Sequence, residues 1–372
     1  MNNAMNNQIN LLDLPGELLS KILLFLPNLN DYKYINKHID QYIDYLSNYY
    51  NKKIDNINKS CQNKLKQLIK SAFSENNENL IIFIYNNLKN SKQLISYYIG
   101  YYNNIHLLSL LNLKNYSDIA EGAALGGHND LIKFATSRGA KNYYKIILSA
   151  AEGGHLNIVH EYLEVFLKSN LKNKKPISLK DIYLEIAISA ARGGSLDIVK
   201  YAIEEGKISD YTAIAVAAAE NGHLNIIIYL VELGFNNFDA IAYFAAKTGH
   251  LDIVEYAVQK GVKDVEDIVE IAAIHGQLNI IKYFIKTGFN DYALIAVSAA
   301  EKGHLNIIKF IIDLGFNNYQ KIAEVAARFG RLEIIKFIMQ FNIQNYEAIK
   351  NCAKRFNNKN IIDYIDNIIK QK

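Results

Sequence analysis

Histidine is the residue in this chain whose type and spacing first suggest chemistry, because imidazole can bind a metal or transfer a proton near neutral pH. It follows a glycine in five places, within segments such as "AAEKGHLNIIKF", Ala299 to Phe310. Along the chain the same slot holds His128, His155, Ser195, His223, His250, Gln277, His304 and Arg331. A metal ligand, a catalytic base and a structural turn residue would all give this pattern.

The spacing of these segments argues against a shared metal ion. Packed helices lie about 8 to 10 Å apart, whereas two imidazoles on one zinc ion each lie about 2.1 Å from it. Serine, glutamine and arginine replace histidine in three segments, and each can satisfy free backbone groups at helix ends. We therefore predict structural turns, with no metal and no cofactor. The turn residues are Gly127, His128, Gly154, His155, Gly222, His223, Gly249, His250, Gly303 and His304.

No other pattern in the chain indicates catalysis. There is no nucleophile beside a base, no glycine-rich phosphate loop and no Cys/His cluster. The two cysteines, Cys61 and Cys352, are far apart and are interpreted as free thiols of a reducing compartment. We predict a protein that is not an enzyme.

Composition limits the partners. The 372 residues are 50% apolar, and 41 basic residues nearly balance 37 acidic ones, which favours neither nucleic acid nor anionic membranes. The start "MNNAMNNQIN" lacks a signal-peptide pattern, and no apolar run is long enough to span a membrane. We expect a soluble monomer in the cytoplasm that binds other proteins.

The elements that carry these turns form an internal repeat. The glycines before the histidine slot recur in steps of 27 residues, except for one step of 40 and one of 28. Such a period predicts a solenoid of stacked units. The eight glycines are Gly127, Gly154, Gly194, Gly222, Gly249, Gly276, Gly303 and Gly330. Degenerate units are expected near "YYNNIHLLSLLN" and "CAKRFNNKNIIDYI".

Each unit predicts two helices of different bulk. Isoleucine stands eight residues before every glycine, and alanines stand three and four before it, which places a small-residue stripe on the first helix. The second helix is apolar on most of its surface, as in "LNIIKFII". Because the first helices are smaller, the array should curve with these helices on its concave side. The expected fold is an all-α, curved solenoid.

The segment "AAxxGHLxIVKYLxxxG" resembles the two helices of the ankyrin repeat. This resemblance implies a protein-binding module. Ankyrin repeats usually span about 33 residues, so the 27-residue period and the missing T-P-L-H signature imply that the projecting hairpins are reduced to tight turns. The compact Asn- and Tyr-rich units are similar to the ankyrin proteins of giant viruses of amoebae, which implies a viral protein in a host cell.

The segment before the array, "LLDLPGELLSKILLFLP", resembles the start of an F-box, a helical segment that docks onto the adaptor subunit of cullin-based ubiquitin ligases. The resemblance assigns docking to Leu14, Pro15, Leu18, Ile22, Leu26 and Pro27. The alternative is a helix that caps the solenoid. We predict an F-box-like segment at residues 1–43, a helical linker or degenerate repeats at 44–102, and the ankyrin array at 103–372.

A partner surface is expected on the first helices, six residues before each glycine. Apolar residues occupy the middle of this otherwise charged column, which also holds Glu121, Glu270 and Glu324. This arrangement suits a protein partner, although scattered exposed apolar residues are also ordinary. The apolar members are Leu148, Ile188, Val216, Tyr243 and Val297. The 40-residue step contains a basic insertion between Lys168 and Lys180, interpreted as a solvated loop or as a finger for an acidic partner.

Overall fold

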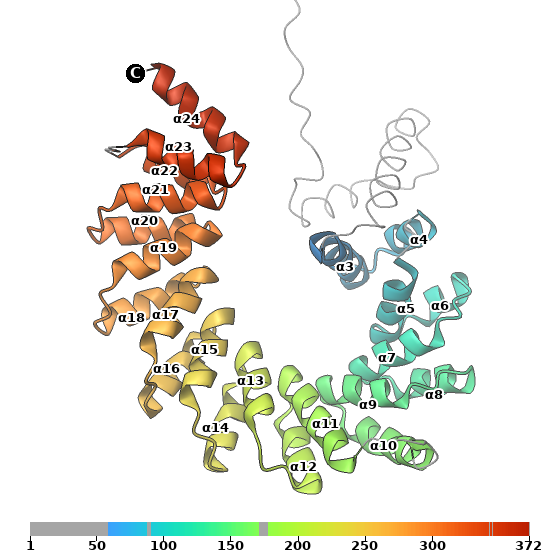
Figure 1. Ribbon diagram of the computed structural model, residues 1–372. Coiled ribbons are helices and arrows are strands. Elements are labelled where there is room, and N and C mark those ends of the chain that lie inside the picture. The colour runs from blue at the N-terminus through green and yellow to red at the C-terminus, as the bar shows by residue number, and fades with distance from the viewer. Residues whose placement is uncertain (1–58, 88–90, 171–177, 342, 344, 372) are drawn as a thin grey trace, which may run out of the picture. The chain divides into compact units, whose positions relative to one another are not determined.

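The computed structural model describes residues 59–87, 91–170, 178–341, 343 and 345–371 (Figure 1). The chain divides into two compact units, Met1–Ser178 and Leu179–Lys372, called unit 1 and unit 2. Every regular element in the described residues is a helix, and none of these residues forms a strand. The all-α fold predicted from the sequence is therefore confirmed.

Helices come in consecutive pairs, and the described residues contain eleven of them. Unit 1 contains α3 (Lys59–Ser74), α4 (Glu78–Asn87), α5 (Ser91–Tyr101), α6 (Ile105–Leu110), α7 (Tyr116–Gly126), α8 (Asn129–Ser137), α9 (Tyr143–Glu152) and α10 (Leu156–Asn170). Unit 2 contains α11 (Leu179–Gly193), α12 (Leu196–Gly206), α13 (Thr212–Asn221), α14 (Leu224–Glu232), α15 (Phe238–Thr248), α16 (Leu251–Lys260), α17 (Val265–Ile274), α18 (Leu278–Lys286), α19 (Tyr292–Lys302), α20 (Leu305–Asp313), α21 (Tyr319–Arg328), α22 (Leu332–Ile338), α23 (Tyr346–Arg355) and α24 (Lys359–Gln371).

The first helix of each pair buries the isoleucine and alanine stripe. In α15, for example, Ile241 is 1% exposed and Ala245 and Ala246 are 0% exposed. Within unit 2 each first helix packs against the next one, from α11 through to α23, more extensively than the second helices pack against each other. Small side chains allow this close approach of the first helices.

The second helices bury the paired β-branched residues that follow each turn, such as Ile307 and Ile308 in α20. On α14, α20 and α22 an aromatic ring is covered by a lysine of the preceding pair. Lys309 Nζ lies 5.3 Å from the Phe337 ring centroid, in the arrangement of a cation–π contact. Such contacts contribute about 0.5 to 1 kcal/mol at exposed sites.

Short links, not hairpins, join one pair to the next. An Asn or Asp at the end of the link caps the following first helix, as where the Asn237 side chain accepts a hydrogen bond from the Ala240 N–H at 3.1 Å. Asp239 ties this helix to the next link, because its carboxylate accepts from the Asp264 and Lys263 N–H groups. These hydrogen bonds lower the pKa of Asp239.

Six second helices have a glycine at or near their C-terminal end, at positions 139, 206, 234, 261, 288 and 315, where a left-handed cap is common. Five of these glycines have positive φ, but Gly206 does not. Gly206 is the last residue of α12, and Lys207, with φ of 48°, is the left-handed residue that follows. A Cβ at Gly206 would lie 2.5 Å from the Tyr183 Cβ, so the glycine is needed there for close packing.

Degenerate pairs extend beyond the eight units that glycine marks. Asn76, Asn103 and Asn357 have φ of 52°, 54° and 61°, and each stands between the two helices of a pair, where the regular units have glycine. Asparagine tolerates this left-handed conformation better than most residues. The described part of 44–102 therefore consists of the pair α3–α4 and the first helix of the pair α5–α6.

Candidate interaction surface

The histidines of the repeated turn bind the backbone of the preceding helix pair. In each case the ring Nε2 lies within hydrogen-bond distance of a carbonyl oxygen near the end of the preceding first helix. The pairs are His128 with Tyr101 at 2.9 Å, His155 with Leu125 at 3.0 Å, His223 with Arg192 at 2.9 Å, His250 with Glu220 at 3.3 Å and His304 with Ile274 at 2.8 Å. Because a carbonyl oxygen can only accept, Nε2 carries the hydrogen.

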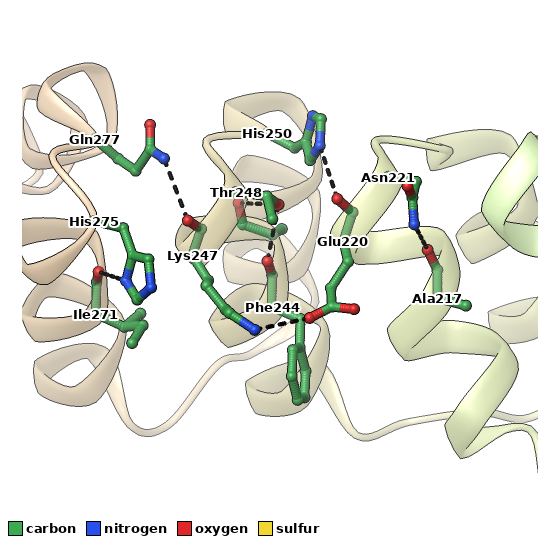
Figure 2. A network of polar contacts seen from close by, with 11 residues as sticks. Ala217, Glu220, Asn221, Phe244, Lys247, Thr248, His250, Ile271, His275 and Gln277 are labelled. Atoms are coloured by element: carbon green, nitrogen blue, oxygen red, sulfur yellow. Dashed lines mark hydrogen bonds and ion pairs between the residues drawn. The ribbon is translucent and has the colours of Figure 1, made fainter. Parts of the chain in front are cut away.

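Two of the three residues that replace histidine, Gln277 and Arg331, make the same inter-repeat hydrogen bond. Gln277 Nε2 donates to the Lys247 oxygen at 3.2 Å, and Arg331 Nε donates to the Glu301 oxygen at 2.8 Å. Figure 2 shows the bonds of His250 and Gln277 in successive pairs. Histidine, glutamine and arginine can therefore each supply the donor of this bond.

This geometry changes the role expected for the histidine. It was predicted to satisfy the backbone within its own turn, but His128, His223, His250 and His304 stand at the N-cap of a second helix without a side-chain capping bond. The free group that each satisfies is a C-terminal carbonyl of the preceding pair. The hydrogen bond therefore joins neighbouring repeats.

The glycine before the histidine slot serves both the turn and the joint. Gly222 has φ of 81°, which side-chain-bearing residues rarely adopt. A Cβ at this position would lie 2.6 Å from Cε1 and Nδ1 of His250, which belongs to the next repeat. Glycine therefore allows the left-handed turn and also leaves room for the neighbouring imidazole.

In the part of the chain that the structure describes, no three His, Cys, Asp or Glu side chains come together as a possible metal site. The Nε2 atoms of the five turn histidines are engaged in inter-repeat hydrogen bonds. These hydrogen bonds join successive repeats and so fix the spacing of side chains on the first helices.

We predict that the inter-repeat hydrogen bond tolerates chemical replacement but not truncation. His250→Ala removes the donor to the Glu220 carbonyl, and we expect the free energy of unfolding to fall by about 1 kcal/mol, the value of a typical hydrogen bond. His250→Gln should lose less than half of this, because Gln277 makes the same bond one unit later. Equal losses in urea titrations of both variants would contradict this assignment.

The predicted partner residues lie on first helices and remain partly accessible. In unit 2 this first-helix row consists of Ile188, Val216, Tyr243, Glu270, Val297 and Glu324, on α11, α13, α15, α17, α19 and α21. Tyr243 is 36% exposed, and the others are half-buried. Leu148 lies half-buried on α9 of unit 1. Because neighbouring first helices pack together in unit 2, the first-helix row is continuous from one repeat to the next.

Charged and aromatic residues flank the row. Glu220 and Lys247 form an ion pair of 3.0 Å between α13 and α15, and Lys247 also lies over the Phe244 ring at 5.6 Å. The carbonyl oxygens of the same two residues accept the inter-repeat bonds, as Figure 2 shows. The surface thus combines apolar centres with fixed charges, which is typical of protein-binding surfaces.

The six residues assigned to adaptor docking, Leu14, Pro15, Leu18, Ile22, Leu26 and Pro27, lie outside the described residues. Three lysines of the basic insertion, Lys172, Lys174 and Lys175, do so as well. Of the two lysines beside them, Lys168 pairs with Glu164 at 3.7 Å on α10, and Lys180 is an exposed residue of α11.

Sequence reasoning placed a degenerate unit at Asn357 but missed the asparagines that take the place of histidine in such units. Asn358 stands in the histidine slot, and its Nδ2 donates to the Ala327 oxygen at 2.8 Å. Asn104 instead caps α6, where its side chain accepts from the Leu107 N–H. The Asn-Asn dipeptides at 76–77, 103–104 and 357–358 were a usable signal, because each falls where a Gly-His pair would stand.

Comparison with known proteins agrees with the helix pairs. Residues 147–240 and 184–268 match the family model described as ankyrin repeats in three copies. A search of curated proteins finds no match. Ankyrin repeats are in general protein–protein interaction modules without enzymatic activity, and the matched part of this chain is similar to them. No helix of the described residues is long and apolar enough to cross a membrane.

Proposed function

We propose that this protein recruits a target protein to a cullin-type ubiquitin ligase. The repeats would bind the target through the first-helix row, and the N-terminal segment would bind the ligase adaptor. If the chain is of viral origin, as its resemblance to ankyrin proteins of giant amoeba viruses suggests, the target is a host protein and the site of action is the host cytoplasm. The repeats themselves perform no catalysis in this scheme.

The match to ankyrin repeats supports the target-binding half of the proposal. The first-helix row adds a physical reason, since half-buried apolar side chains stand there at a fixed spacing between charged residues. A partner that covers Ile188, Val216 and Tyr243 would remove apolar surface from water, at roughly 25 cal/mol per Å².

The order of residues in "LDLPGELLSKILLFLP" is the single observation that carries the ligase half. Leu18, Ile22 and Phe25 recur at helical spacing, and Pro27 ends the pattern. A helix of the length that this spacing predicts cannot bury its apolar side internally, so in this proposal another surface covers it. In the proposed function that surface belongs to the ligase adaptor.

A scaffold without a ligase partner is the second candidate. The α3–α4 pair is the first described pair, and it contains a buried apolar cluster that includes Ile69, Phe73 and Ile81. The first unit of a solenoid needs a cap on its outer side, and an N-terminal helix can serve as one. The two candidates differ in what covers the apolar face of the N-terminal segment, which includes Leu14 and Pro15.

The double substitution Leu14→Asp with Pro15→Ala distinguishes them. If the adaptor covers this face, copurification of the adaptor from host-cell lysate should fall at least about tenfold while the melting temperature stays within error, because a desolvated charge weakens an interface. If the segment is a cap, the melting temperature should fall, and the unmodified chain should not retain the adaptor. Lys21→Glu, in the same segment but outside the docking set, is the matched control and should change neither measurement.

A further inference from the structure

The positive charge of the chain is concentrated in its last two helix pairs. Residues 319–372 contain ten Lys and Arg against five Asp and Glu, a net charge of +5, whereas the whole chain carries +4. The preceding 318 residues are therefore nearly neutral, at a net −1. This asymmetry identifies the C-terminal part of unit 2 as the region that would attract an acidic partner.

Two exposed phenylalanines hold an arginine between them in this region. Phe329 and Phe356 immediately follow α21 and α23 and are 37% and 50% exposed. The Arg328 guanidinium carbon lies 5.3 Å from the centroid of the Phe329 ring and 5.0 Å from that of the Phe356 ring. Contacts with two rings restrict the guanidinium, whose N–H groups are suited to donate to a planar anionic group.

The surrounding groups are contiguous and basic. Arg331 reaches from the turn after α21 to the Glu301 carbonyl, and Asn358 donates to the Arg328 carbonyl at 3.0 Å. Arg355, exposed, is the last residue of α23, beside Phe356. We call Arg328, Phe329, Arg331, Arg355 and Phe356 the C-terminal basic patch. Among the described residues, no carboxylate forms a salt bridge with any of its three arginines.

The patch is particular to these two pairs. The residue directly before the turn glycine is Asn221, Thr248, His275 and Lys302 in the four preceding units, and all of these are polar. The core does not need an aromatic residue there, since those units bury the same Ile and Ala stripe without one. Single exposed apolar residues are ordinary, but two in successive repeats that both contact Arg328 form a defined surface.

We propose that the C-terminal basic patch binds an acidic peptide segment of a partner protein, with carboxylates on the arginines and an apolar side chain beside the phenylalanines. Charge complementarity favours carboxylates, because a fixed guanidinium binds them with two parallel hydrogen bonds. A protein partner is favoured over single-stranded nucleic acid because Arg328 already lies over both rings, and base binding relies on free aromatic faces. This inference goes beyond the proposed ligase role and does not depend on it.

The test measures binding of a short fluorescein-labelled peptide, in which Glu alternates with Leu, to the full chain by fluorescence anisotropy. We expect Arg328→Gln with Arg355→Gln to weaken binding about tenfold or more, since two charge-assisted contacts are lost. Arg328→Lys should have a smaller effect because it keeps the charge but not the planar fork. Phe356→Ser should also weaken binding, by less than the arginine pair.

Arg192→Gln is the matched control, because Arg192 is an exposed arginine at the position of Arg328 in another unit and has glycine beside it. It should leave binding unchanged, and thermal melts should show that all variants remain folded. The proposal is overturned if the Glu–Leu peptide does not bind, if a Gln–Leu peptide binds equally well, or if the Arg192 variant loses as much affinity. Tighter binding of oligothymidine than of the peptide would reassign the patch to nucleic acid.

Discussion

Ala246→Lys is expected to lower the free energy of unfolding by on the order of 3 to 5 kcal/mol. Ala246 is 0% exposed on α15, which packs against both α13 and α17 in unit 2. A lysine there would bury a charge without a partner or push the first helices apart, and either outcome is costly. Because each helix pair is stabilised by its neighbours, the loss of stability should extend to adjacent pairs.

Urea titration followed by circular dichroism measures this loss. Thr248→Lys is the matched control, since Thr248 is exposed two residues further along the same helix, where a basic residue is favourable near the C-terminus. We expect the control to remain within about 0.5 kcal/mol of the parent, as surface substitutions usually do. An Ala246→Lys variant as stable as the parent would show that this stripe is not a packed interface between units.

The repeat could be predicted from the sequence because each of its structural requirements is met by a residue type that few others can replace. The isoleucine eight residues before each glycine and the alanine pair that follows it lie on one helical face, which predicts a buried stripe. Ala245 and Ala246 are the alanine pair of α15. Glycine between two helical patterns requires a left-handed turn. These patterns are local, so a single sequence contains them in full.

The role of the histidine could not be predicted in the same way. Its hydrogen-bond partner lies about 30 residues away, as with His155 and Leu125, and the partner atom is a backbone oxygen that any residue supplies. No side-chain identity in the sequence therefore records the pairing. The same holds for Gly206 and Lys207, where the closeness of Tyr183, not the local sequence pattern, determines which residue takes the left-handed conformation.

The partner surfaces were predictable only in position. The first-helix row follows from helical periodicity, but its binding role stays a prediction, as does the docking role of Leu14 and Pro15. The C-terminal basic patch was not foreseen, although Phe329 and Phe356 are 27 residues apart and thus in register with the repeat. What the sequence lacked was the direction of the Arg328 side chain, which the packing of α21 against α23 determines.

Gly222→Ala should be more destabilising than Gly234→Ala, by about 1 to 3 kcal/mol. Both glycines have positive φ, 81° and 101°, so alanine at either position incurs backbone strain of about 1 to 2 kcal/mol. They differ in surroundings, because a Cβ at Gly234 would meet no atom within 4 Å, whereas at Gly222 it would lie 2.6 Å from the His250 ring. Overpacking of this kind typically costs about 1 to 3 kcal/mol. The comparison is conservative, since the φ of Gly234 lies further from the range that alanine can adopt.

A double-mutant cycle attributes the difference to the imidazole. If the added methyl group of Gly222→Ala destabilises by displacing His250, then combining it with His250→Ala should cost about 1 to 2 kcal/mol less than the sum of the two single losses, because the ring is no longer there to be displaced. The same cycle with Gly234→Ala and His250→Ala should be additive within about 0.5 kcal/mol, since these residues share no contact. Additivity in both cycles would mean that only backbone conformation selects glycine at position 222. The inter-repeat hydrogen bond of His250 would then form whether or not position 222 is glycine.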